Sequence, residues 1–177
     1  MSTPDLREAL ATAEVVHDRA TLEAAIDRMA GEIAPEYADD ARAPLYITVM
    51  HGGLPFAAAL AMALGTLGID LEFDYLHATR YRGQTSGSGL AWLHRPATPM
   101  QGRRVLLADD ILDEGHTLLA VKRWCEDQGA ADVRVAVLAV KVHDRCVEGV
   151  CADYVGVEVP DRYVFGYGMD YHEQGRN

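Results

Sequence analysis

The distribution of apolar and polar residues predicts strands that alternate with helices. Three continuous apolar runs, at 45–50, 105–108 and 133–140, are typical of strands covered on both faces of a sheet. Residues 21–33 and 54–67 instead repeat apolar positions at a helical spacing. This alternation predicts the α/β fold class, with a twisted, mainly parallel sheet flanked by helices. The further expected elements are helices at 4–13 and 117–128 and strands at 71–81, 90–94, 154–157 and 163–167.

Length, composition and charge narrow the class of protein. The chain has 177 residues, 49% of them hydrophobic, which suits one domain spanning 1–177. We expect a cytoplasmic protein without a membrane partner, because no apolar run approaches the roughly 18 residues of a membrane span and the N-terminus lacks a signal-peptide pattern. The net charge of −11 argues against a nucleic-acid partner, although local donors or a metal would still permit a small phosphorylated ligand.

Three polar stretches follow the ends of predicted strands. The tripeptide His-Gly-Gly at 51–53 follows the first apolar run, the acidic stretch 109–117 follows the second, and Lys141 follows the third. In a parallel sheet flanked by helices, ligands bind beyond the carboxyl ends of the strands. We therefore expect the three stretches to form one ligand site.

The stretch 109–117 has the residues of a ribose phosphate site. Gly115 lets the backbone turn sharply before a helix, whose first amides, with the hydroxyl of Thr117, would bind a phosphate. Asp109 and Asp110 offer acceptors instead, which suit sugar hydroxyls or a magnesium ion held directly or through water. A simpler alternative is a strand that ends in solvated acids, one of which caps the following helix.

Two segments carry a resemblance to a known family. Residues 105–117 read VLLADDILDEGHT and resemble the phosphoribosyl diphosphate motif of type I phosphoribosyltransferases, except that Glu114 stands where the family usually has threonine. The closing stretch VGVEVPDRYVFGYGMDYHEQGRN is similar to the segment that covers the purine in the hypoxanthine-guanine branch. The resemblance spans about 45–176 and implies a family core at about 45–150, with a small hood formed by about 1–40 and 151–177.

The resemblance implies an enzyme of purine salvage. It would transfer 5-phosphoribosyl from phosphoribosyl diphosphate to hypoxanthine or guanine, giving IMP or GMP and pyrophosphate, with magnesium as cofactor. Family members commonly form homodimers or homotetramers, so we expect self-association. Two alternatives stay open, namely an enzyme that prefers xanthine and a non-catalytic regulator that senses phosphoribosyl diphosphate.

The resemblance also assigns a purine subsite and a general base. Asp113 would take a proton from the five-membered ring of the purine, and a reference pKa of about 4 keeps such a carboxylate ionised at neutral pH. Lys141 carries only donors and would bond the exocyclic oxygen shared by hypoxanthine and guanine, which disfavours adenine. Tyr163 would stack on the purine, and Val164 would offer backbone groups to its edge.

The remaining assignments concern the phosphates, the metal and a lid. Asp170 would hold a magnesium ion, and Arg80 with Tyr81 begins a Gly/Ser-rich stretch that matches a lid. The family likeness suggests a cis peptide bond between His51 and Gly52. The ribose- and phosphate-binding set is Asp109, Asp110, Gly115, His116 and Thr117, and the pyrophosphate-binding set is His51, Gly52, Arg80 and Arg176. The histidines at 17, 77, 94, 143 and 172 show no metal-ligand spacing, and most are expected at the surface or in packing.

Overall fold

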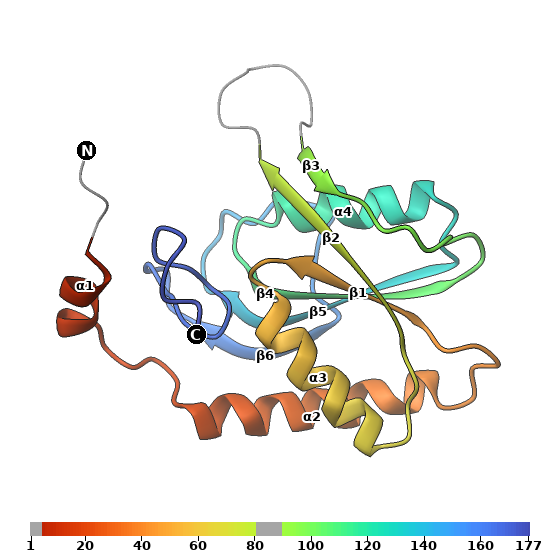
Figure 1. Cartoon of the computed structure of the whole chain (residues 1–177), viewed down its shortest axis with the longest axis horizontal. Helices are drawn as coiled ribbons and strands as arrows, with labels where there is room; N and C mark the ends of the chain where they lie inside the picture. Colours follow the sequence, from red (N-terminus) through yellow and green to blue (C-terminus); the bar gives the residue numbers. More distant parts are fainter. Residues whose placement is uncertain (1–4, 81–89) are drawn as a thin grey trace.

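The computed structural model describes residues 5–80 and 90–177, which form one sheet between two layers of helices (Figure 1). The helices are α1 (Leu6–Thr12), α2 (Arg19–Tyr37), α3 (Leu54–Thr66) and α4 (His116–Asp127). The strands are β1 (Leu45–Met50), β2 (Glu72–Arg80), β3 (Leu90–His94), β4 (Arg104–Leu112), β5 (Asp132–Lys141) and β6 (Tyr154–Val159).

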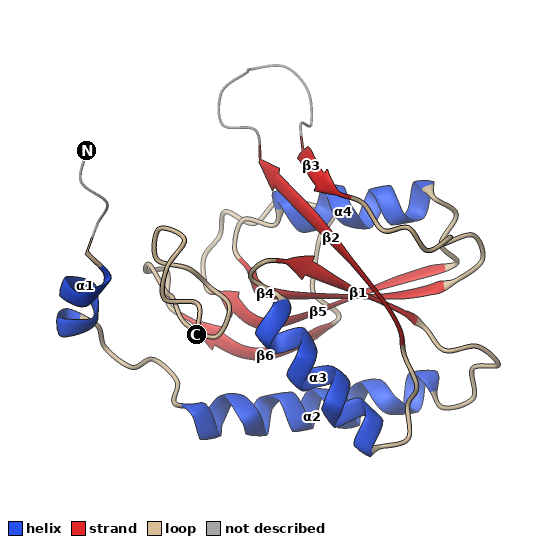
Figure 2. Cartoon of the chain, viewed as in Figure 1, coloured by secondary structure: helices blue, strands red, loops and turns tan. Residues whose placement is uncertain are grey.

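The sheet is mainly parallel, as the sequence predicts. Its strand order is β3-β2-β1-β4-β5-β6. β1 pairs in parallel with β2 and β4, and β5 pairs in parallel with β4 and β6, whereas β3 runs antiparallel to β2. Figure 2 shows α2 and α3 on one side of the sheet and α4 on the other. The predicted fold class is therefore confirmed.

The side chains of β1 show how the two faces of the sheet are filled. Leu45, Ile47 and Val49 belong to the hydrophobic cluster that α4 completes. Tyr46 points to the other face, joins the cluster of α2 and α3, and donates its hydroxyl to the carbonyl of Ala57 at 2.9 Å. Full burial of a leucine, isoleucine or valine side chain stabilises the fold by roughly 1.5–3 kcal/mol. Burial on both faces explains why the strand appears in the sequence as an unbroken apolar run.

β4 is longer than the sequence predicts, and the difference changes the position of the acids. The expected strand covered 105–108, but β4 continues through Asp109 and Asp110 to Leu112. Its parallel pairing with β5 includes Ile111 and Leu112, so the backbone ladder extends the strand beyond its apolar run. Both aspartates are consequently held by the sheet itself rather than by a loop that follows it.

The prediction of a strand at 163–167 is wrong. After β6, the described residues form turns, with an isolated bridge between Gly166 and Met169. Gly166 and Gly168 have φ angles of 96° and 109°, which are incompatible with an extended strand. The two glycines therefore outweigh the strand preference of the aromatic residues between them and before them.

α2 begins two residues before the expected start and ends four residues after the expected end. The carboxylate of Asp18 caps it, accepting from the backbone N–H of Thr21 at 2.8 Å. The helix was expected to end at 33, but it continues through Pro35 to Tyr37, because Tyr37 is buried against the sheet. None of the helices within 5–80 and 90–177 combines the length and apolar character needed to cross a membrane.

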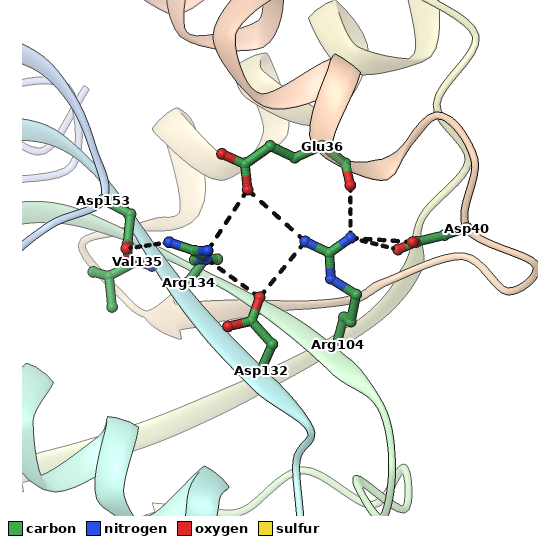
Figure 3. Close-up of polar contacts among 7 residues, drawn as sticks. All are labelled: Glu36, Asp40, Arg104, Asp132, Arg134, Val135 and Asp153. Carbon is green, nitrogen blue, oxygen red and sulfur yellow. Dashed lines mark hydrogen bonds and ion pairs between the residues drawn. The ribbon is translucent and has the colours of Figure 1, made fainter.

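An ion-pair cluster fixes α2 to the amino ends of β4 and β5 (Figure 3). Its charged members are Glu36, Asp40, Arg104, Asp132, Arg134 and Asp153. Arg104 donates to the carbonyl of Glu36 at 2.6 Å, and Arg134 donates to the carboxylate of Asp153 at 3.0 Å. Because parallel strands begin at this edge, the cluster stabilises the end of the sheet opposite to the acids of β4.

The segment after β6 returns to the carboxyl edge of the sheet (Figure 1). Its Gly168 lies so close to the carbonyl of Gly52 that a Cβ on Gly168 would collide with that oxygen. Beyond it, Gly175 lies beside Leu6 of α1. The segment therefore contacts both the loop after β1 and the N-terminal helix. The division of the chain into a core and a hood stays a prediction.

Candidate active site

A cavity of about 550 Å³ opens at the carboxyl edge of the sheet. The ends of β1, β2 and β4, the start of α4 and the C-terminal segment line it. The edge thus gathers stretches that lie far apart in the sequence, as the parallel topology predicts. The predicted site residues that line the cavity are His51, Gly52, Asp109, Asp110, Asp113, Gly115, His116, Thr117 and Arg176.

The loop after β1 passes directly over the acids of β4. A Cβ on Gly52 would collide with the carboxylate of Asp110, so only glycine brings the backbone this close. The cis peptide bond of this loop joins Met50 to His51, one residue before the expected His51–Gly52 bond. The expected position is therefore wrong by one residue, because the resemblance locates the segment but not the cis bond within it.

The start of α4 has the geometry of an anion site. Gly115 is the N-cap residue with a φ of 81°, a left-handed conformation that favours glycine. No side chain caps this helix start, which leaves the first amides oriented toward the cavity that His116 and Thr117 line. A helix of twelve residues adds the positive end of its dipole at the same place. This arrangement suits a phosphate group.

Glu114 occupies the position where the family usually has threonine. Its carboxylate lies 3.7 Å from Nε2 of His116, and its carbonyl accepts from the backbone N–H of Val147 at 2.9 Å. The residue also lines the cavity. The carboxylate of Glu114 thus faces the imidazole of His116.

Asp109 and Asp110 form a buried acidic pair. Asp110 donates its backbone N–H to Oδ1 of Asp109 at 2.9 Å, and Ile111 donates to Oδ1 of Asp110 at 2.8 Å. Burial, followed by the neighbouring charge of Asp110, raises the pKa of Asp109 well above its usual value. Burial likewise raises the pKa of Asp110, although hydrogen bonds with Asp109 and the backbone of Ile111, and then the guanidinium of Arg176, oppose this. A ligand that offers hydroxyl groups or positive charge would favour the ionised pair.

Asp113 is held by two side chains from the region after β5. Lys141 donates from Nζ to Oδ2 of Asp113 at 2.5 Å, and Nε2 of His143 lies 2.7 Å from Oδ1. Desolvation raises the pKa of Asp113, but the hydrogen bonds from Lys141 and His143 outweigh it and hold that pKa below its usual value. A carboxylate in this setting is ionised at neutral pH.

His143 is a site residue that the sequence analysis missed. Its side chain is only 3% exposed and belongs to the Asp113 cluster rather than to general packing. The one available signal was its position two residues after Lys141, at the same edge of the sheet. His77 and Glu173 were also missed and line the cavity, where the ring of His77 lies 4.2 Å from the ring of His51.

Arg176 is fixed by the C-terminal segment at the rim of the cavity. Its guanidinium donates to the carbonyl of Gly168 at 2.8 Å and lies 3.0 Å from a carboxylate oxygen of Asp170. A second contact, of 3.1 Å, joins it to Glu173. The other oxygen of Asp170 accepts the backbone N–H of Glu173 at 2.8 Å. Asp170 therefore orients Arg176 and lies outside the cavity lining.

Of the predicted residues that the structure describes in full, Lys141, Tyr163, Val164 and Asp170 do not line the cavity. Tyr163 is 63% exposed and donates its hydroxyl to the carbonyl of Asp170 at 2.9 Å, while Val164 is partly buried beside it. Arg80 is the last residue of β2. Tyr81 lies outside the described residues. The purine and lid assignments thus stay predictions.

Comparison with known proteins supports the same interpretation. A family model described as the phosphoribosyl transferase domain matches residues 12–173. The hypoxanthine-guanine phosphoribosyltransferase of Streptococcus pneumoniae is 34% identical over 164 residues, which cover 92% of this chain and 87% of that relative. The enzyme of the same name from Bacillus subtilis is 35% identical over 86% of this chain and 82% of its own.

A solved structure extends the likeness to three dimensions. The hypoxanthine phosphoribosyl transferase of Trypanosoma cruzi matches with a TM-score of 0.86 and 25% sequence identity, covering 93% of this chain and 87% of that one. The family model, the curated relatives and the fold agree with the resemblance found in the sequence. The chain therefore belongs to the phosphoribosyl transferase domain family.

Proposed function

We propose that this enzyme acts in purine salvage, joining hypoxanthine or guanine to 5-phosphoribosyl diphosphate to give IMP or GMP and pyrophosphate. The observation that carries the proposal is the single cavity in which the acids of β4 face the uncapped start of α4. Acceptors for hydroxyls beside donors for a phosphate suit a ribose phosphate. The relatives named hypoxanthine-guanine phosphoribosyltransferase support the choice of base.

The ribose phosphate would bind between β4 and α4. The amides of Gly115, His116 and Thr117, with the Thr117 hydroxyl, would hold the 5′-phosphate, while Asp109 and Asp110 would accept bonds from the ribose hydroxyls. Burial destabilises the ionised form of both carboxyl groups and so raises their pKa values. Hydrogen bonds donated by the sugar hydroxyls would stabilise that ionised form. With its phosphate bound at α4 and its hydroxyls bound at β4, the ribose would direct its anomeric carbon toward the side of the cavity where Asp113 lies.

The diphosphate would lie beneath the C-terminal segment. His51 and Gly52 line the cavity next to Asp110, and Arg176 supplies a guanidinium that Gly168 and Asp170 hold in place. A guanidinium presents several donors in a fixed plane, which suits phosphate oxygens. We infer that Arg80, at the end of β2, adds a further positive charge and that Tyr81 belongs to the lid.

Magnesium fits this site as an ion that arrives with the diphosphate. Asp109 and Asp110 provide oxygen donors in the cavity, and magnesium commonly pairs one or two carboxylates with substrate phosphates and water. Asp170 fits less well as a direct ligand, because both of its oxygens already bond within the C-terminal segment. When bound, the ion would neutralise negative charge on the departing pyrophosphate.

The purine would bind between Lys141 and Tyr163. Lys141 would leave Asp113 to donate to the exocyclic oxygen of the base, and Tyr163 with Val164 would cover the ring. Asp113 would then accept the proton of the ring nitrogen while that nitrogen bonds to the anomeric carbon and pyrophosphate leaves with the electrons of the broken C–O bond. The ionised state of Asp113 at neutral pH suits this role.

The test is a steady-state assay of the purified chain with labelled phosphoribosyl diphosphate, magnesium, and hypoxanthine, guanine or xanthine. We expect turnover of the first two bases, and a fall of roughly 100-fold or more in kcat for Asp113→Asn with little change in the KM for phosphoribosyl diphosphate. Turnover of xanthine alone would favour the xanthine enzyme, and no turnover of any base would favour the regulator. The homo-oligomer and the cytoplasmic location stay predictions.

A further inference from the structure

The protonation of His143 follows from its two hydrogen bonds. Nδ1 of His143 receives the backbone N–H of Arg145 at 3.1 Å, and a backbone N–H can only donate. Nδ1 is therefore the unprotonated nitrogen, so Nε2 carries the proton and donates it to Oδ1 of Asp113 at 2.7 Å. The imidazole is a neutral donor aimed at the carboxylate.

The loop that carries His143 is itself fixed to the C-terminal segment. The guanidinium of Arg145 makes two bonds to the carboxylate of Asp161, at 2.8 and 2.7 Å. Paired bonds of this kind restrict orientation as well as distance. The side chain of His143 is thus enclosed, oriented at one nitrogen by Arg145 and bonded at the other to Asp113.

The two oxygens of Asp113 have different partners. Lys141 occupies Oδ2, and in the proposed reaction it must leave that oxygen to reach the purine. His143 occupies Oδ1 and has no such second role. Once Lys141 has moved, His143 is the side chain that keeps the carboxylate from rotating and keeps Oδ2 directed at the ring nitrogen.

We propose that His143 is a positioning residue for the phosphoribosyl transfer proposed above, orienting the general base Asp113 through the neutral Nε2–H. The inference rests on the proposed function, because it assumes that Asp113 accepts the purine proton. The donor also supports the ionised state of the base. Among residues 5–80 and 90–177, the other titratable or charged groups around the pair are Lys141, Arg145, Asp161, Glu114 and His116.

Two substitutions separate positioning from a structural role. In His143→Asn, the amide oxygen takes the place of Nδ1 and keeps the bond to Arg145, but no donor reaches Asp113. In His143→Gln, the amide nitrogen takes the place of Nε2 and keeps the donor to Asp113, while the bond to Arg145 is lost. A positioning role predicts that Gln rescues activity, and a role confined to the loop predicts that Asn does.

The experiment measures kcat, KM and the pH profile of kcat for the full chain and both variants. We expect His143→Asn to lower kcat about tenfold, the equivalent of one hydrogen bond to a charged group, with the KM for phosphoribosyl diphosphate unchanged. Its acid limb should move to higher pH, because the pKa of Asp113 rises when a donor is lost. His143→Gln should keep kcat within about threefold of the parent chain. So should His94→Gln, a control at a histidine that stacks on Tyr75 and does not line the cavity.

The outcomes separate failure of the positioning role of His143 from failure of the proposed function. Full activity and an unmoved acid limb in His143→Asn, or rescue by Asn rather than Gln, would overturn the positioning role. An inactive parent chain, or an Asp113→Asn variant as active as the parent, would instead reject the proposed function. Thermal unfolding of each variant identifies losses of kcat that arise from a damaged fold.

Discussion

Lys141 and Asp113 form a close ion pair, with 2.5 Å between Nζ and Oδ2. The side chain of Lys141 is 14% exposed, whereas that of Asp113 is 42% exposed and faces the cavity. The ammonium group proposed to recognise the purine thus occupies the oxygen proposed to take the purine's proton. In the proposed reaction, Lys141 therefore exchanges Asp113 for the purine as its hydrogen-bond partner. Binding of the purine would in this way free Oδ2 of Asp113 to accept the purine's proton.

Lys141→Met tests this exchange. Methionine keeps much of the apolar stem but has no donor for the exocyclic oxygen. We expect the KM for hypoxanthine to rise at least tenfold, as the loss of a charged hydrogen bond predicts, while the KM for phosphoribosyl diphosphate changes little. Steady-state kinetics with each substrate varied in turn measure both. An equal loss toward both substrates would mean that the lysine is structural.

Gly52→Ala tests the contact between the loop after β1 and Asp110. The added methyl group would collide with the Asp110 carboxylate and displace either the loop or the acid. We expect binding of phosphoribosyl diphosphate to weaken at least tenfold, as calorimetry would show, because both partners lie in the cavity.

A matched glycine control exists in α2. A Cβ at Gly31 meets nothing within 4 Å, so Gly31→Ala should leave binding unchanged and raise the free energy of unfolding by about 0.5–1 kcal/mol. If Gly52→Ala bound phosphoribosyl diphosphate as well as Gly31→Ala does, the close contact would have no part in binding.

Asp153→Ala tests the ion-pair cluster at the amino edge of the sheet. The Asp153 carboxylate accepts from Arg134 at 3.0 Å and from the backbone N–H of Val135 at 2.8 Å, and its side chain is 17% exposed. Losing both bonds should lower the free energy of unfolding by about 2 kcal/mol in urea titrations. Asp39→Ala, at an exposed loop position, should change it by less than about 0.5 kcal/mol.

Acid should destabilise the fold through carboxylates that accept hydrogen bonds. Burial raises the pKa of Asp74, but its bonds from the backbone of Thr98 and Tyr75 outweigh this and lower it. A lowered pKa gives stability that is full above the unfolded value near 4 and is lost as pH falls through the folded value. Melting temperatures should therefore drop below about pH 4, and Asp74→Asn should reduce that drop. A variant with the same acid slope as the parent chain would exclude Asp74 as a contributor.

The sequence predicts the sheet and the glycine turn before α4 because those features depend on local patterns. Buried strands show as apolar runs, and Gly115 before a helix marks a turn that only a few residues allow. The extension of β4 through Asp109 and Asp110 could not be predicted in this way. It depends on pairing with β5, which residue polarity does not record.

The cluster around Asp113 was only partly predictable for the same reason. Lys141 was expected at the carboxyl edge because it follows a buried strand. The bond from His143 depends on how the loop after β5 folds back over residue 113, and Arg145 and Asp161 fix that loop through contacts distant in sequence. A histidine in a loop has no pattern that separates a packing role from a bond to a carboxylate in the cavity.

The packing around Gly52 has a consequence for divergence among relatives. Gly52 lies against the carboxylate of Asp110, and Gly168 lies against the carbonyl of Gly52, so three distant segments share one contact. A side chain becomes tolerable at position 52 only after its neighbours have changed. Evolutionary drift at these three sites should therefore be concerted, and an isolated replacement at one of them should be rare among active homologues.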